Sequence, residues 1–330
     1  MRTAVFGTGS WGTAFSMVLT DAGTDVVMWG YEAEVCDLIN RTHENPLYHP
    51  GIGLADSVRA TPDPAEALDG AEMVVLAVPA QTLRANLEHW AALFPRDVIV
   101  VSLMKGIELG TAKRMTQVVA EVVGTPDDRL VAVSGPNLAR EIAERQPSAT
   151  TVACADEATA VRVQKACHTP RFRPYTNTDV VGTELGGAVK NVIALATGIA
   201  DGLDFGENSK AAVITRGLAE TSRLGAALGA VPSTFMGLAG LGDLVATCMS
   251  PLSRNRTFGE RMGRGESVES IAASTRQVAE GVKSCESILM LAQRSGVDMP
   301  IVEHVVHVVH GDMTPLQMMD SLLSREVKPE

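Results

Sequence analysis

The sequence predicts an α/β fold in which a mostly parallel β-sheet comes first and an all-helical region follows. Short runs of β-branched and other apolar residues alternate with longer helical patterns through the first half of the chain. These runs are continuously apolar, which is typical of strands that are buried on both faces of a parallel sheet. From about Asp179 onward, long helical patterns replace the short apolar runs. A glycine motif directly after the first apolar run adds a third observation, discussed below.

Each strand candidate is followed by a turn or a helical pattern, which is the order of βαβ units and predicts a doubly wound sheet. The expected strands are residues 3–6, 25–29, 73–78, 98–102 and 130–134, with a weaker candidate at 150–153. The helical patterns between them include residues 64–68, 80–93 and 112–123.

The helical patterns of the second half are separated by breaks that contain glycine or proline. They cover residues 182–200, 209–228, 267–273, 283–294 and 299–309. The 330 residues are enough for two domains of ordinary size. We predict a first domain at residues 1–180 and an all-α second domain at 181–330, closely packed because no linker sequence separates them.

Composition excludes several functional classes. The formal net charge of −11 argues against a general nucleic-acid binder, which needs a broad basic surface. The five cysteines are scattered without a CxxC pair, so we expect reduced, mostly buried thiols and neither disulfides nor a zinc site. No apolar run approaches the roughly 20 residues of a membrane span. We therefore predict a cytoplasmic protein without membrane insertion.

The sequence GTGSWG follows the first predicted strand and has the form GxGxxG, at Gly7, Gly9 and Gly12. In a strand–turn–helix unit, the first glycine permits the tight turn, the second lets the backbone approach a pyrophosphate, and the third allows close helix–strand contact. The helix that starts near Ser10 would direct its free N–H groups toward the phosphates. The motif predicts a Rossmann-type first domain that binds NAD or NADP.

The end of the second predicted strand bears on which of the two cofactors binds. Glu32 has the spacing of the acidic residue that accepts hydrogen bonds from the adenosine ribose of NAD. No arginine stands at Gly30, Tyr31 or Glu32 to neutralise the extra phosphate of NADP. One or two residues of register decide whether Glu32 faces the ribose, so both cofactors stay open.

Three further segments are more specific: SLMKGIE at residues 102–108, VSGPNLA at 133–139, and GLAGLGDLVATCMSPLSRNR at 237–256. Together with GTGSWGTA at 7–14 and ELGGAVKNVIALATGIADGL at 184–203, they resemble the NAD(P)-dependent glycerol-3-phosphate dehydrogenase family, most closely its soluble bacterial members. The resemblance runs in order through nearly the whole chain. It implies the reversible reduction of dihydroxyacetone phosphate to sn-glycerol 3-phosphate, a glycerophospholipid precursor. It also implies a homodimer.

The resemblance also implies roles for individual residues. Lys190 resembles the family's proton donor and acceptor, Lys105 a lysine shared by substrate and nicotinamide, and Asp243 a substrate contact that orients Lys190. The implied substrate contacts are Lys105, Gly135, Asn137, Lys190, Asp243, Ser253, Arg254 and Asn255. The predicted cofactor contacts, in addition to the three glycines, are Ser10, Trp11, Tyr31, Lys105, Ala139, Arg254, Val278 and Glu280. Family members often carry Ser or Thr and then Phe where this chain has Asn137 and Leu138, which puts the fine geometry of that contact in doubt.

The segment SPLSRNRTFGERMGRG, residues 250–265, contains four arginines. Only Arg254 matches the family's phosphate-binding position, where a planar guanidinium suits the paired oxygens of a phosphate. We expect Arg256, Arg261 and Arg264 to form a solvated surface or a wider attractive field for anions.

The histidines of EHVVHVVHGD, at positions 304, 307 and 310, have a spacing that could ligate a metal ion. The HExxH motif is missing, so we assign them to helix packing and the helix C-terminus and expect no metal. Two other hypotheses for the function of the whole chain remain. One is a related two-domain hydroxy-acid dehydrogenase, and the other is a non-catalytic nucleotide-binding regulator.

Overall fold

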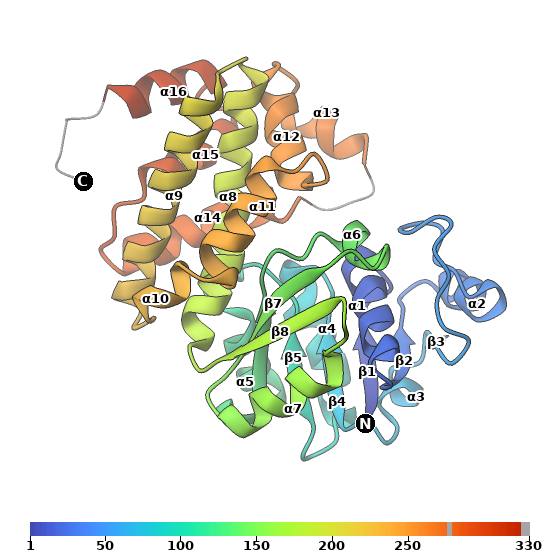
Figure 1. Ribbon diagram of the computed structural model, residues 1–330. Coiled ribbons are helices and arrows are strands. Elements are labelled where there is room, and N and C mark those ends of the chain that lie inside the picture. Colours follow the sequence, from blue (N-terminus) through green and yellow to red (C-terminus); the bar gives the residue numbers. More distant parts are fainter. Residues whose placement is uncertain (276–278, 325–330) are drawn as a thin grey trace.

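The computed structural model describes residues 1–275 and 279–324, and its first half is built around one twisted sheet (Figure 1). The eight strands lie in the order β3-β2-β1-β4-β5-β6-β7-β8, and neighbours are parallel except for the antiparallel pair β6–β7. Their bounds are β1 Arg2–Phe6, β2 Asp25–Trp29, β3 Arg59–Thr61, β4 Met73–Leu76, β5 Ile99–Ser102, β6 Leu130–Ser134, β7 Ser148–Cys154 and β8 Phe172–Asn177. The predicted α/β class with a mostly parallel sheet is confirmed.

Helices cover both faces of this sheet, which explains the continuous apolar runs of its central strands. One face packs against α1 (Ser10–Asp21), α2 (Ala33–Thr42), α6 (Ala139–Ala143) and α7 (Glu157–Cys167). The other face packs against α3 (Pro64–Leu68), α4 (Leu83–Trp90) and α5 (Met115–Val123). Every residue of β4, β5 and β6 is buried.

Strands β3 and β8 were not predicted from the sequence, and both lie at the edges of the sheet. Strand β3 has only three residues, and β8 contains Pro174 and alternates buried with exposed residues. Proline is tolerated in strands mainly at edges, and short or mixed runs give little hydrophobic signal. The weak candidate at 150–153 is part of β7, which extends further at both ends.

The second half consists of helices packed around α8 (Val180–Gly202), which is buried over most of its length. The other helices are α9 Glu207–Ala227, α10 Pro232–Phe235, α11 Asp243–Met249, α12 Arg254–Gly263, α13 Val268–Ala273, α14 Glu280–Arg294, α15 Pro300–His310 and α16 Pro315–Leu323. A helix that is apolar on all sides belongs in the centre of a helical domain, and Figure 1 shows α8 surrounded by its neighbours.

Helices α8 and α12 touch backbone to backbone. A Cβ atom added at Gly198 would lie 2.0 Å from the carbonyl oxygen of Arg256, and one at Gly259 would lie 2.1 Å from that of Leu195. One turn further on, a Cβ atom at Gly202 would lie 2.1 Å from the carbonyl oxygen of Glu260, and one at Gly263 would lie 2.5 Å from that of Ile199. Glycine on both helices is what allows this approach.

The cysteines and the C-terminal histidines have the structural roles expected of them. All five cysteines are buried and unpaired, as predicted. His304 binds the carbonyl oxygen of Pro300 through Nδ1 and the hydroxyl group of Ser321 through Nε2, while His310 pairs with Glu286.

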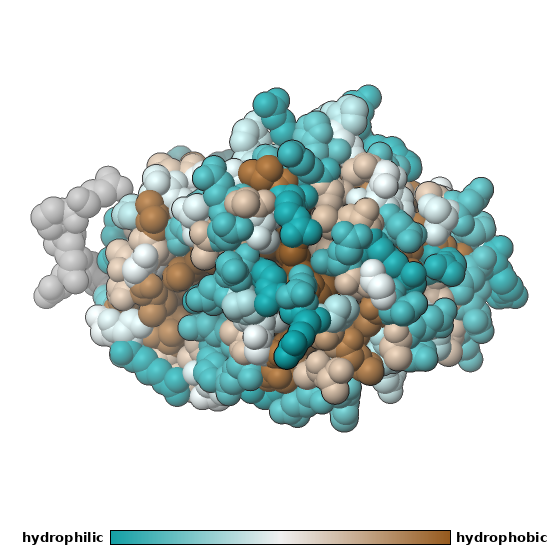
Figure 2. All heavy atoms as spheres, turned by 90° about the horizontal axis from the view of Figure 1, so that it is seen from below, coloured by the Kyte–Doolittle hydropathy of each residue, from teal (hydrophilic) through white to brown (hydrophobic). Residues whose placement is uncertain are grey.

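Over residues 1–275 and 279–324, no single helix has the length and apolar composition to cross a membrane. One pair of helical segments, Pro232–Met249 and Arg254–Gly263, passes that test together but is bent by 48°. Figure 2 shows one face of the molecule, on which hydrophilic side chains predominate and apolar ones emerge in separate small groups.

Glu220 is a buried carboxylate in α9 that is not among the predicted site residues. It is 2% exposed, and it accepts hydrogen bonds from the backbone N–H groups of Ile301 and Val302 at the start of α15. Burial raises the pKa of its carboxyl group to about 7, although these N–H groups act in the opposite direction. Because the native group holds its proton more tightly than the unfolded one, its stabilising contribution is complete below pH 4.5 and is lost as the pH rises to about 7.

We expect the Glu220→Gln variant to reveal this loss. Relative to the wild type, it should gain roughly 3 kcal/mol of unfolding free energy between pH 4.5 and pH 8, because glutamine carries no charge to bury. Urea unfolding of both proteins at several pH values measures the difference. A difference that does not change with pH would show that Glu220 ionises normally in the folded protein.

Candidate active site

The glycine loop after β1 has the shape that the motif predicts. Gly7 has φ +129°, and a Cβ atom at Gly12 would lie 2.0 Å from the carbonyl oxygen of Gly7. A Cβ at Gly9 would meet nothing within 4 Å, so the backbone is open to a ligand there. No side chain caps α1 at its N-cap residue Gly9, which leaves first-turn N–H groups available for an anion. The loop therefore fits the pyrophosphate of a dinucleotide.

Two side chains that sequence reasoning left without a role hold this glycine loop in place. Nδ2 of Asn45 donates to the carbonyl oxygen of Thr8 (2.8 Å) and to the hydroxyl group of Thr13 (2.9 Å). His49 is 1% exposed, and its Nε2 lies 2.8 Å from the carbonyl oxygen of Ser10. Burial lowers the pKa of His49, so a neutral ring donates from Nε2. The only signal in the sequence was the polar loop HENPLYHPG itself.

The predicted adenosine contacts lie at the end of β2 and the start of α2. Tyr31 is 86% exposed, and Glu32 is also exposed. Glu32 is the N-cap residue of α2, but its side chain makes no capping hydrogen bond. These side chains are accessible to a cofactor lying along the carboxyl edge of the sheet.

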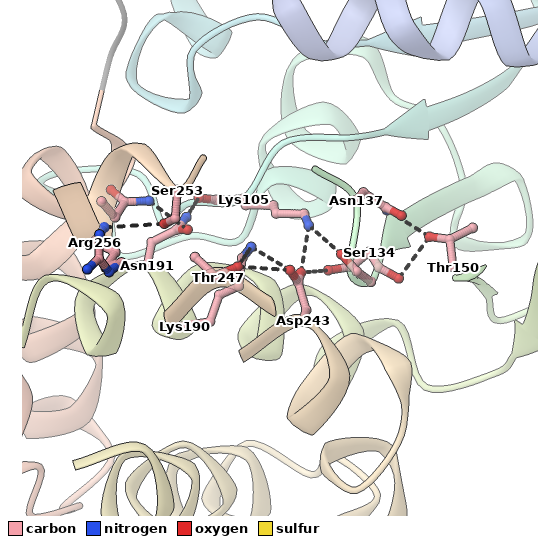
Figure 3. A network of polar contacts seen from close by, with 12 residues as sticks. Lys105, Ser134, Asn137, Thr150, Lys190, Asn191, Asp243, Thr247, Ser253 and Arg256 are labelled. Atoms are coloured by element: carbon pink, nitrogen blue, oxygen red, sulfur yellow. Dashed lines mark hydrogen bonds and ion pairs between the residues drawn. The ribbon is translucent and has the colours of Figure 1, made fainter. Parts of the chain in front are cut away.

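The centre of the site is a buried carboxylate between two lysines (Figure 3). Oδ2 of Asp243 lies 2.6 Å from Nζ of Lys105, and its Oδ1 lies 2.5 Å from Nζ of Lys190. Asp243 is 1% exposed and Lys190 8%. The three residues come from α11, from the loop after β5, and from α8, so the fold brings the three predicted catalytic residues together.

The charges in this cluster shift one another. Burial alone would raise the pKa of Asp243, but the ammonium groups of Lys105 and Lys190 outweigh it and lower that pKa. Burial lowers the pKa of Lys105 to about 8, with Asp243 opposing this shift and Lys190 adding to it. Asp243 is therefore a carboxylate at neutral pH, and Lys105 is poised to exchange a proton in the working range of an enzyme.

Two hydroxyl groups complete the cluster, and neither was singled out from the sequence. The hydroxyl of Thr247 lies 2.5 Å from Nζ of Lys190 and donates to Oδ1 of Asp243 at 3.2 Å. The hydroxyl of Ser134 donates to Oδ2 of Asp243 at 3.3 Å. Thr247 follows Asp243 by four residues on α11, a spacing that places both on one helix face and could have identified it.

A short π-helical segment, η4 (Leu238–Gly242), directly precedes α11 and places its start at the cluster. Segments of this kind are rare and occur often at functional sites. The glycines of GLAGLGD therefore serve the turn that leads into α11, and Asp243 is its first residue.

The loop after β6 forms one wall of the site. The carbonyl oxygen of Gly135 accepts a hydrogen bond from Nζ of Lys105 at 3.1 Å. Nδ2 of Asn137 donates to Thr150, while its Oδ1 is buried without a hydrogen-bond partner. Ala139 is the first residue of α6. An amide oxygen held without a partner at this wall suits a donor on a ligand.

The start of α12 forms another wall. The Ser253 hydroxyl group caps the helix by accepting from the backbone N–H of Arg256, and Arg254 is the first helical residue. Arg254 is exposed to solvent, yet protein surrounds it closely enough that desolvation lowers its pKa, against the charge of Glu280. It forms no salt bridge within 4 Å among the described residues, so its guanidinium is available to an anion.

The other three arginines of this segment are occupied. Arg256 pairs with Asp201 and Glu260, Arg261 with Glu266, and Arg264 with Glu260. The expectation that all three are simply solvated is wrong for Arg256, whose side chain is only 18% exposed. Their paired charges also weaken the proposed wider field for anions.

Asn255 connects α12 with α8 and α14, and Glu280 at the start of α14 contacts Ala80. Nδ2 of Asn255 donates to Oδ1 of Asn191, and its Oδ1 accepts from the backbone N–H of Gly281, both at 2.9 Å. Oε1 of Glu280 accepts from the backbone N–H of Ala80 at 3.4 Å, while Oε2 is buried without a partner. Burial raises the pKa of Glu280, against Ala80 and Arg254. Val278, a predicted cofactor contact, lies outside the described residues.

Together these walls enclose a site at the carboxyl ends of β1, β5 and β6, opposite α8, α11, α12 and α14. A glycine loop suited to pyrophosphate lies on the sheet side, and Arg254 begins α12 next to Asn255, which is hydrogen-bonded to Asn191 beside Lys190 on α8. Two lysines on a buried carboxylate can donate or accept a proton, and the arginine can hold a dianion. The arrangement suits proton transfer to the oxygen of a small anionic substrate beside a bound dinucleotide.

Comparisons with known proteins agree with this geometry. The family model described as NAD-dependent glycerol-3-phosphate dehydrogenase N-terminus matches residues 2–160, and the corresponding C-terminus model matches residues 179–320. A glycerol-3-phosphate dehydrogenase (NAD(P)+) from Streptomyces griseus is 64% identical over 330 residues, which is 100% of this chain and 98% of that protein. A second protein of that name from Mycobacterium tuberculosis is 57% identical over 327 residues, 99% of this chain and 98% of its own.

Solved structures show the same similarity. The crystal structure of glycerol-3-phosphate dehydrogenase from Coxiella burnetii superimposes with a TM-score of 0.94 at 35% identity, covering 98% of this chain and 99% of that one. D-mandelate dehydrogenase, at 14% identity and a TM-score of 0.63 over 98% of this chain and 100% of its own, shares the fold alone.

Proposed function

The chain belongs to the NAD-dependent glycerol-3-phosphate dehydrogenase family, and we propose on this basis that it reduces dihydroxyacetone phosphate reversibly to sn-glycerol 3-phosphate. The reductant is NADH or NADPH, and the product is a precursor of glycerophospholipids. The observation that carries the proposal is the Lys105–Asp243–Lys190 cluster, together with the unpaired Arg254 at the start of α12, which packs on α8. It provides a proton and a phosphate-binding cation in one site.

Lys190 is the proposed proton donor. Its ammonium group has three N–H bonds, and Asp243 and Thr247 accept two of them. The third is available to the oxygen at C2 of the substrate, where it stabilises the forming alkoxide and then protonates it. When bound, the nicotinamide would supply the hydride that C2 receives. In the reverse direction, Lys190 takes the proton from the C2 hydroxyl group.

Lys105 and Asp243 hold this proton donor in place. Asp243 accepts from both lysines, which fixes their separation and keeps the ion cluster balanced in a buried position. Lys105 spends two N–H groups on Asp243 and on the Gly135 carbonyl oxygen, which leaves one for the substrate or the nicotinamide carboxamide.

The proposed binding residues follow from the walls of the site. Gly135, Asn137, Ser253, Arg254 and Asn255 surround the substrate, with Arg254 on its phosphate. The proposed cofactor contacts among the described residues are Gly7, Gly9, Ser10, Trp11, Gly12, Tyr31, Lys105, Ala139, Arg254 and Glu280. Partnerless buried atoms support several of these positions, namely Nε1 of Trp11, Oδ1 of Asn137 and Oε2 of Glu280.

The test of the proposed function is to follow the absorbance of reduced nicotinamide with dihydroxyacetone phosphate as substrate. NADH and NADPH are used in separate runs, and a 2-oxo acid serves as the competing substrate. Oxidation of either cofactor that depends on dihydroxyacetone phosphate supports the proposal. Turnover of the 2-oxo acid alone would favour a hydroxy-acid dehydrogenase, and no turnover with any substrate would refute both.

Replacing Arg254 with alanine tests the phosphate contact. We expect the KM for dihydroxyacetone phosphate to rise about 10–100-fold, the equivalent of one charge-assisted hydrogen bond. The matched control is Arg264→Ala, which removes an arginine at the opposite end of α12 that is paired with Glu260. Equal effects of the two substitutions would place the phosphate elsewhere.

We also propose that the chain works in the cytoplasm as a homodimer, with a domain division at residues 1–180 and 181–330. The end of β8 at Asn177 and the start of α8 at Val180 support the division. Five unpaired cysteines suit a reducing compartment. Exposed Met236, Val245 and Met249 offer an apolar surface for a second copy, and light scattering would determine the mass in solution.

A further inference from the structure

Helix α8 contacts the loop that carries Lys105 at both of its ends. This lysine loop, residues 103–114, connects β5 to α5. Glu184, Gly187 and Asn191 face it from α8 at positions i, i+3 and i+7, which places them along one side of the helix. Lys190 stands on the same helix, next to Asn191.

Asn191 binds the first end of the lysine loop. Its Nδ2 donates to the carbonyl oxygen of Lys105 at 3.2 Å, and its Oδ1 accepts from Asn255. The backbone N–H of Gly281 donates to the other end of the Asn255 amide. A backbone donor at one end and a backbone acceptor at the other fix the orientation of both amide groups, so neither can flip without losing a bond.

Glu184 binds the far end of the lysine loop, where α5 begins. It is 6% exposed and accepts from the backbone N–H of Thr116 at 2.9 Å and from the Thr116 hydroxyl at 2.6 Å. It also forms a salt bridge with Arg114. A buried carboxylate from α8 thus holds the first turn of α5 through three bonds.

The stem of Lys105 passes over Gly187 between these two anchors, where glycine leaves room for the Ser134 hydroxyl group. A Cβ atom at this position would lie 2.6 Å from Oγ of Ser134 and 3.4 Å from Cγ of Lys105. The lysine side chain therefore runs directly over the helix on its way to Asp243.

We propose that Glu184 and Asn191 are positioning residues, which clamp the lysine loop onto α8 and so set the place of Lys105 relative to Lys190. The inference rests on the proposed function. Two helical turns separate the anchors, about 10 Å along the axis, so the single rigid helix α8 holds both ends of the loop. Ser287 and Arg84 hold the middle of the loop at Ile107 and Glu108. Loss of one anchor therefore shifts Lys105 and does not unfold the loop.

The experiment measures kcat and KM for Asn191→Ala and Glu184→Gln, alone and in a Lys105→Ala background. We expect each single substitution to lower kcat about 10–100-fold, the cost of misplacing a reacting group by about 1 Å. In the Lys105→Ala background each should cost less than about 3-fold, because residues that act through one another are not additive. Glu220→Gln is the matched control, since Glu220 is also buried and also binds backbone N–H groups at a helix start. It should leave kcat within about 2-fold, the range of a substitution that touches no reacting group.

Full additivity with Lys105→Ala would overturn the clamp, as would a loss of kcat that merely follows the folded fraction. If the Lys105→Ala background is too slow to measure, the pH profile decides. The pKa of Lys105 is about 8 in the native cluster. In Asn191→Ala a more hydrated Lys105 should move the alkaline limb of kcat/KM to higher pH, and an unmoved limb would overturn the clamp. Failure of wild-type turnover would instead refute the proposed function itself.

Discussion

Replacing Lys190 with alanine will lower kcat by about 10²–10⁴-fold, the usual contribution of a general acid–base group. Lys190 gives two of its N–H bonds to Asp243 and Thr247, and the proposed mechanism uses the third to protonate the C2 oxygen. The fold should survive, since Asp243 keeps its salt bridge with Lys105. Steady-state kinetics and NADH binding, measured by fluorescence, will separate chemistry from cofactor affinity.

The matched control is Lys210→Ala. Lys210 is an ion-paired lysine of the same half of the chain, bonded to Asp201 and Glu207. It should cost no more than about 0.2–1 kcal/mol of stability, as a partly exposed pair does, and leave kcat unchanged. A Lys190→Ala protein with wild-type kcat would remove the proton-transfer role from this residue.

The Asp243→Asn substitution will damage both stability and activity. It leaves two ammonium groups in a buried position without their counter-charge, at an expected cost of about 3–5 kcal/mol of unfolding free energy. The pKa of Lys105, already lowered to about 8, should fall further because Asp243 is the main group that raises it. Activity should drop at least about 100-fold, in line with the loss of an oriented acid–base group.

Urea unfolding and pH–rate profiles measure these two effects. Glu220→Gln is the informative contrast, because Glu220 is a buried carboxylate that forms no salt bridge within the described parts of the chain. At pH 8 the two substitutions should act on stability in opposite directions. Equal effects would mean that the lysines carry no charge in the native cluster.

Much of the fold could be predicted because its central strands are buried on both faces. Strands β1, β2, β4, β5 and β6 are continuous apolar runs, and burial leaves little freedom in how such a run folds. The edge strands could not be found this way, because β3 is too short and β8 carries Pro174. Helix α12 was also missed, since its glycines weaken the helix signal while its arginines suggest a solvated segment.

The candidate site divides in the same way. Lys105, Lys190 and Asp243 stand in motifs that point to chemistry, and the fold brings them together. Ser134 and Asn191 act through contacts between distant segments, which no local pattern encodes, whereas Thr247 lies one helical turn after Asp243 and could have been found from that spacing. Asn45 and His49 belong to this second group, because their partners are carbonyl oxygens of the glycine loop. Sequence identifies groups that react, whereas tertiary contacts decide which groups hold them.

The backbone contact between α8 and α12 limits how this enzyme could be redesigned. Lys190 stands on α8 and Arg254 begins α12. The distance between the proposed proton donor and the proposed phosphate-binding arginine therefore depends on where the two helices touch. At Gly198 and Gly259 the contact is main chain against main chain, with no side chain to trim or enlarge. Substitutions at that crossing therefore cannot adjust the distance between Lys190 and Arg254 by small amounts. Substitutions that make room for a longer phosphate ester should start from the lysine loop, because side chains lie between this loop and α8.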